Sequence, residues 1–158
     1  MTRKLTDWLK AWWPAFVWAA VITTFSTDAF SGEHTSRVIL PFLRWLFPDA
    51  GAQALELMHH FIRKAGHVTE YFVLGLLLLH AVRAGRTGWR LEWAVTAVAI
   101  AAGWAGLDEL HQAFVPSRGP SIIDVLIDVS GAGAAQIVAY FVSTIRSRPS
   151  SLPAQQPQ

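Results

Sequence analysis

Apolar residues fill four long stretches of the chain, and shorter polar segments separate them. The stretches cover about residues 11–27, 67–83, 91–113 and 121–145. An α-helix needs about 17 to 25 such residues to cross a hydrocarbon core roughly 30 Å thick, and each stretch falls in that range. The pattern therefore predicts an all-α integral membrane protein with four transmembrane helices.

The chain between the first two stretches is amphipathic rather than uniformly apolar. Leu55, Met58 and Ile62 recur at helical spacing, with polar residues between them. This pattern is typical of helices that lie along a membrane surface. We therefore expect two short interfacial helices, at about residues 36–47 and 50–65.

Basic residues are divided unequally between the two sides of the predicted membrane. If both termini are cytoplasmic, eight of the 13 Lys and Arg residues fall on the cytoplasmic side. Cytoplasmic loops carry such an excess, so this orientation in the inner (cytoplasmic) membrane is the one we expect. Residues 1–145 then form one membrane domain, and the Pro-, Ser- and Gln-rich segment 146–158 forms a disordered cytoplasmic tail.

The composition agrees with a membrane protein and excludes some functions. Hydrophobic residues make up 53% of the chain and charged residues only 15%. The net charge of +2 comes from dispersed basic residues, whereas a nucleic-acid partner would require them clustered on one face. The chain has no cysteine, which excludes disulfides, thiolate metal ligands and a cysteine nucleophile.

One stretch, residues 107–128, places many polar side chains in or beside the predicted membrane. They are Asp108, Glu109, His111, Gln112, Arg118, Asp124 and Asp128. Charged groups cost free energy in a bilayer unless they are paired or hydrated, so such residues usually mark function. We therefore treat this stretch as the centre of a candidate site.

Helical geometry gathers the polar residues into three stripes at a similar depth. At about 100° per residue, the stripes are Arg63, His67 and Glu70; Asp108, His111 and Gln112; and Ser121, Asp124 and Asp128. With a rise of about 1.5 Å per residue, Glu70, Asp108 and Asp128 all reach the outer third of the hydrocarbon core. The sequence therefore predicts one shared site at the outer face.

Some of these residues also fit ordinary structural duties. Ser121 followed by Asp124 is typical of a helix N-terminal cap with an acidic first turn. The small residues at 131–135 allow close packing between helices. An ion-pair network that holds the helices together would explain the charges without any ligand, and its loss would impair folding.

A binding site is the interpretation that uses both signs of charge. Arg63, Lys64 and Arg118 would receive an anionic head group, while neighbouring acids and His67 would bind its hydrogen-bond donors. We also expect Arg118 to pair with one of the nearby carboxylates. The partner would then be a membrane lipid or a lipid-linked component of the cell envelope.

An enzyme active site is the alternative, because a histidine and a buried carboxylate can act as base and acid. The candidates are His67 or His111 as base and Asp108 or Glu109 as acid. The pairs His67-x-x-Glu70 and Asp108-x-x-His111 resemble metal-binding pairs of helical bundles. The positive charges of Arg63, Lys64 and Arg118 lie nearby and would repel a metal ion. We therefore expect neither a metal nor a cofactor.

Two motifs of the chain resemble the VanZ-like family of bacterial membrane proteins. They are RKAGHVTEYFVLGLLL at residues 63–78 and DELHQAFVPSRGPSIIDVLIDVSGAGAA at residues 108–135. The resemblance covers about residues 15–143. The residues that match the family's recurrent polar and small positions are Lys64, His67, Glu70, Tyr71, Asp108, Glu109, Gln112, Arg118, Asp124, Asp128 and Gly131. The chain departs from the pattern in having Ser117 where a glycine is usual and Asp128 where asparagine is common.

The resemblance implies a role at the outer face of the membrane. The name-giving member of the family is associated with low-level resistance to teicoplanin, a glycopeptide antibiotic with a lipid tail. We therefore expect a site that binds an amphiphilic envelope component and influences glycopeptide susceptibility. The expected ligand-binding residues are Arg63, Lys64, His67, Glu70, Tyr71, Asp108, Glu109, Gln112, Arg118, Asp124 and Asp128.

Overall fold

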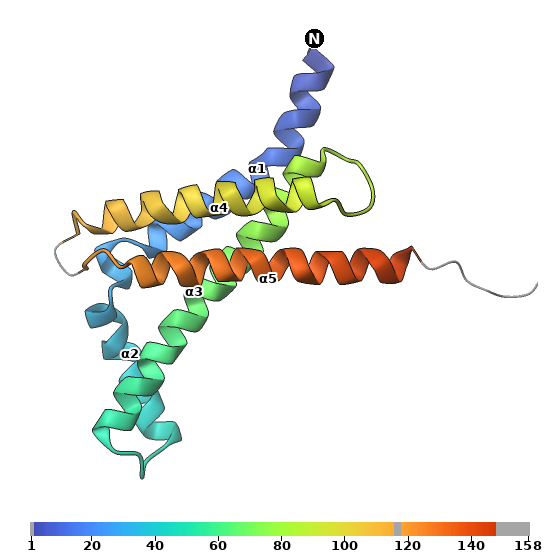
Figure 1. Ribbon diagram of the computed structural model, residues 1–158. Helices are drawn as coiled ribbons and strands as arrows, with labels where there is room; N and C mark the ends of the chain where they lie inside the picture. Colours follow the sequence, from blue (N-terminus) through green and yellow to red (C-terminus); the bar gives the residue numbers. More distant parts are fainter. Residues whose placement is uncertain (1, 116–117, 148–158) are drawn as a thin grey trace, which may run out of the picture.

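The computed structural model contains only helices in the part of the chain that it describes, residues 2–115 and 118–147 (Figure 1). In chain order the elements are α1 (Thr2–Phe25), the short 3-10 helix η1 (Asp28–Phe30), α2 (Gly32–Leu46), α3 (Ala52–Arg83), α4 (Leu91–Gln112) and α5 (Ile122–Arg146). The prediction of an all-α fold is confirmed for these residues.

α3 is one continuous helix of 32 residues, whereas the sequence predicted an interfacial helix at 50–65 and a separate span at 67–83. Only Gly66 lies at the expected break. A single glycine inside a helix costs about 1 kcal/mol relative to alanine, which is too little to end a helix with favourable neighbours on both sides. The amphipathic segment is therefore the first half of α3.

α2 packs against that first half of α3 and corresponds to the helix predicted at 36–47. It begins earlier than predicted because Ser31 caps it, with the Ser31 hydroxyl accepting a hydrogen bond from the His34 amide (3.4 Å). Farther along the helix, Thr35 Oγ1 lies 3.3 Å from Nε2 of the buried His59. These contacts join α2 and the first half of α3 into a helical hairpin.

α3 occupies the centre of the molecule and contacts α1, α2, α4 and α5. Figure 1 shows α1 and α4 running towards one end of the molecule, while α3 and α5 run towards the other. α3 and α5 approach each other closely, because a Cβ atom added to Gly131 would lie 2.5 Å from the Val68 carbonyl oxygen. Farther along the same pair of helices, a Cβ on Gly75 would lie 3.0 Å from Ala132 Cα. The small residues of α5 thus pack directly on the α3 backbone.

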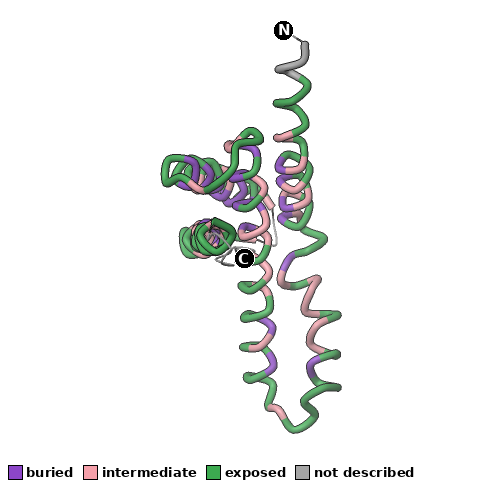
Figure 2. The backbone as a smooth tube through the Cα atoms, turned by 90° about the vertical axis from the view of Figure 1, so that its right-hand side faces the viewer, coloured by how far each residue is buried: buried purple, intermediate pink, exposed green. Residues whose placement is uncertain are grey.

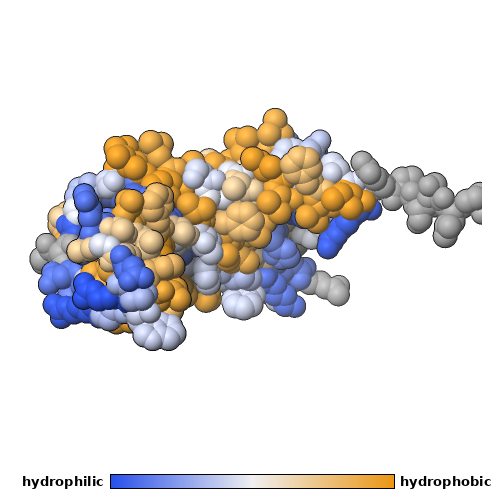
Figure 3. All heavy atoms as spheres, turned by 90° about the horizontal axis from the view of Figure 1, so that it is seen from below, coloured by the Kyte–Doolittle hydropathy of each residue, from blue (hydrophilic) through white to orange (hydrophobic). Residues whose placement is uncertain are grey.

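By length and composition, α3 and α5 are the two helices of the described chain that qualify as candidate membrane spans, so the expected four transmembrane helices are not confirmed. Large apolar side chains are exposed around the bundle, including Val95, Leu126 and Ile137. Figure 2 shows the exposed residues on the outward sides of the helices, and Figure 3 shows hydrophobic residues between two hydrophilic ends. Such extensive apolar exposure is unusual for a soluble monomer and supports a membrane protein.

Helix boundaries agree with the predicted apolar stretches at most ends. α4 and α5 match the stretches 91–113 and 121–145 to within one residue at each end. α1 begins at Thr2, nine residues before the predicted stretch. Of the predicted tail 146–158, all but the first two residues lie outside the described part of the chain, and α5 includes Arg146.

Candidate functional site

A buried cluster joins the end of α4 to the residue that follows α1. Ser26 Oγ donates a hydrogen bond to Asp108 Oδ2 (2.5 Å), and Gln112 Nε2 donates to the same oxygen (2.9 Å). All three side chains are at most 4% exposed. The pair at positions 108 and 112 was expected from helical spacing, because residues four apart share a face. Ser26 completes the cluster from a different part of the chain.

A second buried contact joins α3 to α5. His67 Nδ1 lies 3.1 Å from Asp128 Oδ1, and Asp128 is only 1% exposed. This contact forms because the small residues of α5 allow the two helices to approach closely near Val68 and Gly131. Tyr71 lies one turn beyond His67 on α3 and is completely buried. The predicted stripes of α3 and α5 therefore face each other.

Two other predicted residues hold the start of α5 in place. Glu109 Oε2 accepts a hydrogen bond from the Ser121 amide (2.6 Å), and the Ser121 hydroxyl accepts one from the Asp124 amide (3.3 Å). Asp124 also pairs with Lys64 of α3, with Nζ and Oδ1 2.8 Å apart. Ser121 therefore has the capping role that the sequence suggested. The Lys64–Asp124 pair is partly exposed and connects α3 to α5 at the surface.

Arg118 makes different contacts from those predicted. Its Nη2 atom donates to the backbone carbonyls of Phe25 (2.8 Å) and Phe30 (2.6 Å), at the end of α1 and in η1. It forms no ion pair with a carboxylate of the described residues, which corrects the expected pairing. The reason is that the turn after α1 presents free carbonyl oxygens closer to the guanidinium than any acid.

The electrostatic surroundings of Arg118 are mixed. Burial lowers the pKa of its guanidinium from the ordinary value, and the nearby charge of Arg63 lowers this pKa further. The carboxylates of Asp108, Glu109 and Glu70 act in the opposite direction. Arginine has so high an ordinary pKa that it stays protonated near neutral pH. The two arginines are therefore like charges held close to one another.

A polar pocket of about 280 Å³ opens between these elements. Its charged and polar lining comes from four parts of the chain. Arg63, His67 and Glu70 belong to α3, Arg118 to the loop before α5, Ser26 to the segment that follows α1, and Thr35 to α2. Its apolar lining is Phe25, Phe30, Ile39 and Ile62. We call this the outer pocket, because it lies at the end of the molecule that the sequence places outside.

Four of the eleven predicted ligand-binding residues line the outer pocket: Arg63, His67, Glu70 and Arg118. The others lie behind it or at the contacts between helices. Asp108 reaches the pocket only through Ser26, and Asp128 only through His67. His111, a candidate base, is exposed at the end of α4 and does not line the pocket. On α4, Gln112 lies on the buried face with Asp108, whereas His111 points away from it.

The residues missed by sequence reasoning come from outside the three stripes. Ser26 and Thr35 supply hydroxyl groups, and Ile39 of α2 supplies part of the apolar wall. One feature of the sequence could have identified Ser26, because it lies near the end of the first apolar stretch, at the same outer level as Asp108. α2 had none, because its amphipathic pattern does not reveal which helix it packs against.

Several buried polar atoms around the site have no hydrogen-bond partner among the described residues. They are Tyr71 Oη, Asp108 Oδ1, Glu109 Oε1, Asp128 Oδ2 and Arg118 Nε. Buried polar atoms usually do have a partner, and of these five residues only Arg118 lines the outer pocket. Within residues 2–115 and 118–147, no group of three or more His, Asp or Glu residues is placed to hold a metal ion.

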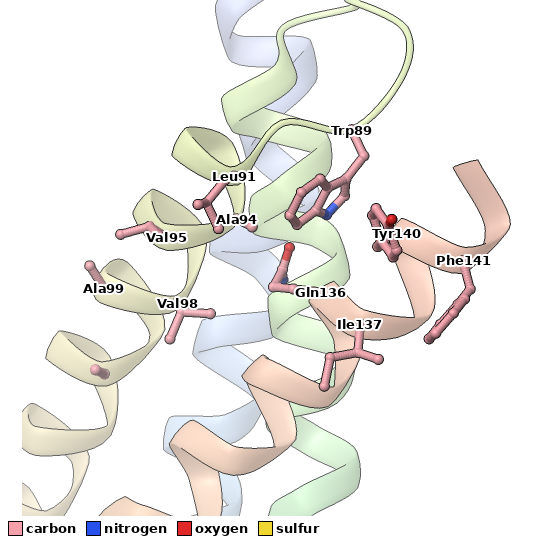
Figure 4. Close-up of a pocket in the computed structure, with 11 residues that line it drawn as sticks. Trp89, Leu91, Ala94, Val95, Val98, Ala99, Gln136, Ile137, Tyr140 and Phe141 are labelled. Atoms are coloured by element: carbon pink, nitrogen blue, oxygen red, sulfur yellow. The ribbon is translucent and has the colours of Figure 1, made fainter. Parts of the chain in front are cut away.

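A larger cavity elsewhere in the molecule has a different character. It is a groove of about 670 Å³ between α4 and α5, lined almost entirely by apolar side chains (Figure 4). Gln136 is its main polar residue, and its Nε2 atom already donates to the Gly75 carbonyl (3.0 Å). This groove offers little to recognise a polar group, so the chemistry is concentrated in the outer pocket.

Comparison with known proteins agrees with the two polar motifs. A family model described as VanZ/LLP1 matches residues 11–143, which is most of the chain. A search of curated proteins and a search of solved structures each found no match. The matched segment contains the outer pocket and every predicted site residue. The chain therefore belongs to the VanZ/LLP1 family, as the resemblance of its sequence predicted.

Proposed function

We propose that this protein is a four-span protein of the inner membrane, with both termini cytoplasmic, whose outer pocket binds an amphiphilic component of the cell envelope. The observation that carries the proposal is the lining of the outer pocket. It combines two arginines with an apolar wall in one cavity of about 280 Å³. That combination suits a ligand with an anionic head and a hydrocarbon tail.

Arg63 and Arg118 would hold the anionic part of the ligand. The Arg63 guanidinium lies against the start of α2, where a Cβ atom on Gly32 would be 2.5 Å from Nη1. Among the described residues it forms no ion pair with a carboxylate. Arg118 uses Nη2 for two carbonyls, and its Nε has no partner in the described chain. Two like charges facing one pocket are stabilised when an anion lies between them.

The rest of the pocket would bind the remainder of the ligand. His67 and Glu70 can exchange hydrogen bonds with hydroxyl or amide groups, as sugars and peptides carry. Phe25, Phe30 and Ile62 form the apolar side, where the first part of a hydrocarbon chain would lie. The volume suits a head group and the start of a chain, with the rest of the chain in the membrane.

Mass spectrometry of gently purified protein tests this proposal. Arg63→Gln should reduce the amount of bound envelope lipid about tenfold or more, because a charge-assisted hydrogen bond is lost while the fold is kept. Arg37→Gln is the matched control, since Arg37 is exposed on α2 and pairs with Glu33 (3.2 Å). Equal lipid content in Arg63→Gln and the unaltered protein would end the proposal.

A susceptibility assay tests the link to glycopeptides. A strain that produces the unaltered protein should tolerate more teicoplanin than the same strain producing Arg63→Gln. A glycopeptide without a lipid tail should show a smaller difference, because the proposed ligand is amphiphilic. Equal tolerance in both strains, with equal protein in the membrane, would contradict the link while leaving lipid binding to be judged by mass spectrometry.

An enzyme that acts on a lipid-linked substrate is a second candidate, and the His67–Asp128 contact favours it. A histidine oriented by a buried carboxylate is an arrangement that general bases use, and His67 lines the outer pocket. His111 does not line the outer pocket, so His67 is the better of the two base candidates. The acid candidates Asp108 and Glu109 are buried and engaged in hydrogen bonds to Ser26 and Ser121. Conversion of a labelled lipid precursor, lost in His67→Gln with binding retained, would support an enzyme. Absence of any conversion by the unaltered protein would refute it.

A further inference from the structure

A second polar cavity lies at the opposite end of the molecule, between the last turns of α3 and α5. Its volume is about 620 Å³. Its polar lining includes the guanidinium groups of Arg83 and Arg146 and the imidazole ring of His80. Its apolar lining includes Leu76, Val138 and Val142. No Asp or Glu of the described chain lines it. We call it the inner cavity, and its properties do not depend on the function proposed for the outer pocket.

The turn after α3 fixes the position of Arg83. Its Nε atom donates to the Arg86 carbonyl (3.1 Å), and Arg86 Nε donates back to the Arg83 carbonyl (2.9 Å). Ala84 and Gly85 have positive φ angles of 49° and 81°, which turn the chain sharply enough for this exchange. The reciprocal bonds hold the Arg83 side chain through Nε, so its two Nη atoms can serve a ligand.

The arginines at this end of the molecule differ in their partners. Arg86 lies over the Trp93 ring at 4.7 Å, and Arg90 pairs with Glu92 at 3.1 Å. Arg83 and Arg146, which line the inner cavity, have no carboxylate partner within the described residues. Basic residues are common in the last turn of a helix because they offset its dipole. That preference does not explain why the two unpaired arginines belong to different helices and face one cavity.

The apolar part of the inner cavity continues along the outside of the helices. Leu76, Val138 and Val142 line it, and all three are substantially exposed. Figure 3 shows hydrophobic residues leading to hydrophilic ones at the end of α5. A ligand there would meet charge at its head and hydrocarbon-like surface beneath, in the order found across a lipid leaflet.

We propose that the inner cavity binds a phospholipid with a net negative head group. Arg83 and Arg146 contact the phosphate, as arginine recognises phosphate in other proteins, and Ser143 donates a further hydrogen bond from its hydroxyl. The first segments of the acyl chains follow Leu76, Val138 and Val142. A zwitterionic lipid binds more weakly, because its own cation faces the same arginines.

Thermal unfolding in detergent, followed by tryptophan fluorescence, tests this site. Dioleoylphosphatidylglycerol should raise the unfolding midpoint of the unaltered protein more than dioleoylphosphatidylcholine at the same concentration. Arg83→Gln and Arg146→Gln should each need about fivefold more phosphatidylglycerol for the same rise. Arg90→Gln is the control, because Arg90 lies at the same end but pairs with Glu92 and does not line the cavity.

The outcomes distinguish a lipid site from a general charge effect and from a site for a free anion. An equal response to both lipids, or unchanged phosphatidylglycerol dependence in both variants, overturns the proposal. An equal loss in Arg90→Gln means a general charge effect and also overturns it. Inorganic phosphate is the last probe. If phosphate alone raises the unfolding midpoint as much as phosphatidylglycerol does, the cavity is a site for a free anion and the lipid proposal is overturned. Arg146 is exposed on the last turn of α5, so its replacement leaves the fold intact even if Arg83→Gln loosens the turn.

Discussion

Replacement of Gly131 by alanine probes the contact on which the candidate site depends. The added Cβ would lie 2.5 Å from the Val68 carbonyl oxygen and 3.2 Å from Val68 Cα. These are backbone atoms, which cannot rotate away as a side chain would. The two helices must therefore move apart by several tenths of an ångström or more. Overpacking of this kind typically costs about 1 to 3 kcal/mol.

Gly133→Ala is the matched control for Gly131→Ala. Gly133 lies on the same helix, and a Cβ there would have nothing within 4 Å. Alanine favours a helix over glycine by about 1 kcal/mol, so Gly133→Ala should be neutral or slightly stabilising. The two variants differ only in the neighbour of the new methyl group. Their difference in stability therefore measures the approach of α5 to α3.

Thermal unfolding in detergent is the assay for this pair. With roughly 2 to 4 °C per kcal/mol for a chain of this size, Gly131→Ala should lower the unfolding midpoint by about 2 to 12 °C. The separation should also weaken the contact between His67 and Asp128, which lies next to the same crossing. If Gly131→Ala and Gly133→Ala unfold at the same temperature, the close approach of the helices is refuted.

Three further substitutions separate structural from functional roles. Ser26→Ala should destabilise the fold by about 1 to 3 kcal/mol, because it removes a donor from the buried Asp108, and unchanged thermal unfolding would contradict that contact. Lys64→Ala should lower the free energy of unfolding by less than about 1 kcal/mol, since the ion pair of Lys64 with Asp124 is partly exposed. A larger loss of stability would contradict that estimate. Arg118→Ala should increase proteolysis after α1, because two backbone carbonyls lose their donor, and an unchanged digestion pattern would argue against that role.

Much of the fold follows from the pattern of apolar residues. The four apolar stretches become parts of α1, α3, α4 and α5. The break expected near residue 66 does not occur, because helix continuity depends on neighbours along the whole segment rather than on one weak residue. The packing of α2 on α3 could not be predicted either, since amphipathicity identifies a buried face but not its partner.

Less of the candidate site follows from the sequence, and the reasons are geometric. Helical spacing placed Asp108 and Gln112 on one face, and they share an interaction. The same spacing could not decide whether His111 turns inward, because that depends on the angle at which α4 packs. It also could not find the carbonyl partners of Arg118, because backbone acceptors leave no mark in the pattern of side chains.

The length of α3 has a consequence for how a ligand would reach the outer pocket. A helix of 32 residues is about 48 Å long, whereas a hydrocarbon core is roughly 30 Å thick. Ordinary tilts absorb only part of the difference, so an α3 that spans the membrane would extend into the head-group layer. The amphipathic first half of α3 suits that layer, and α2 packs on it, with Ile39 of α2 and Ile62 of α3 both lining the outer pocket. If the outer pocket binds a lipid as proposed, a molecule anchored in the leaflet would enter sideways, from the side that α2 and α3 line, without leaving the membrane.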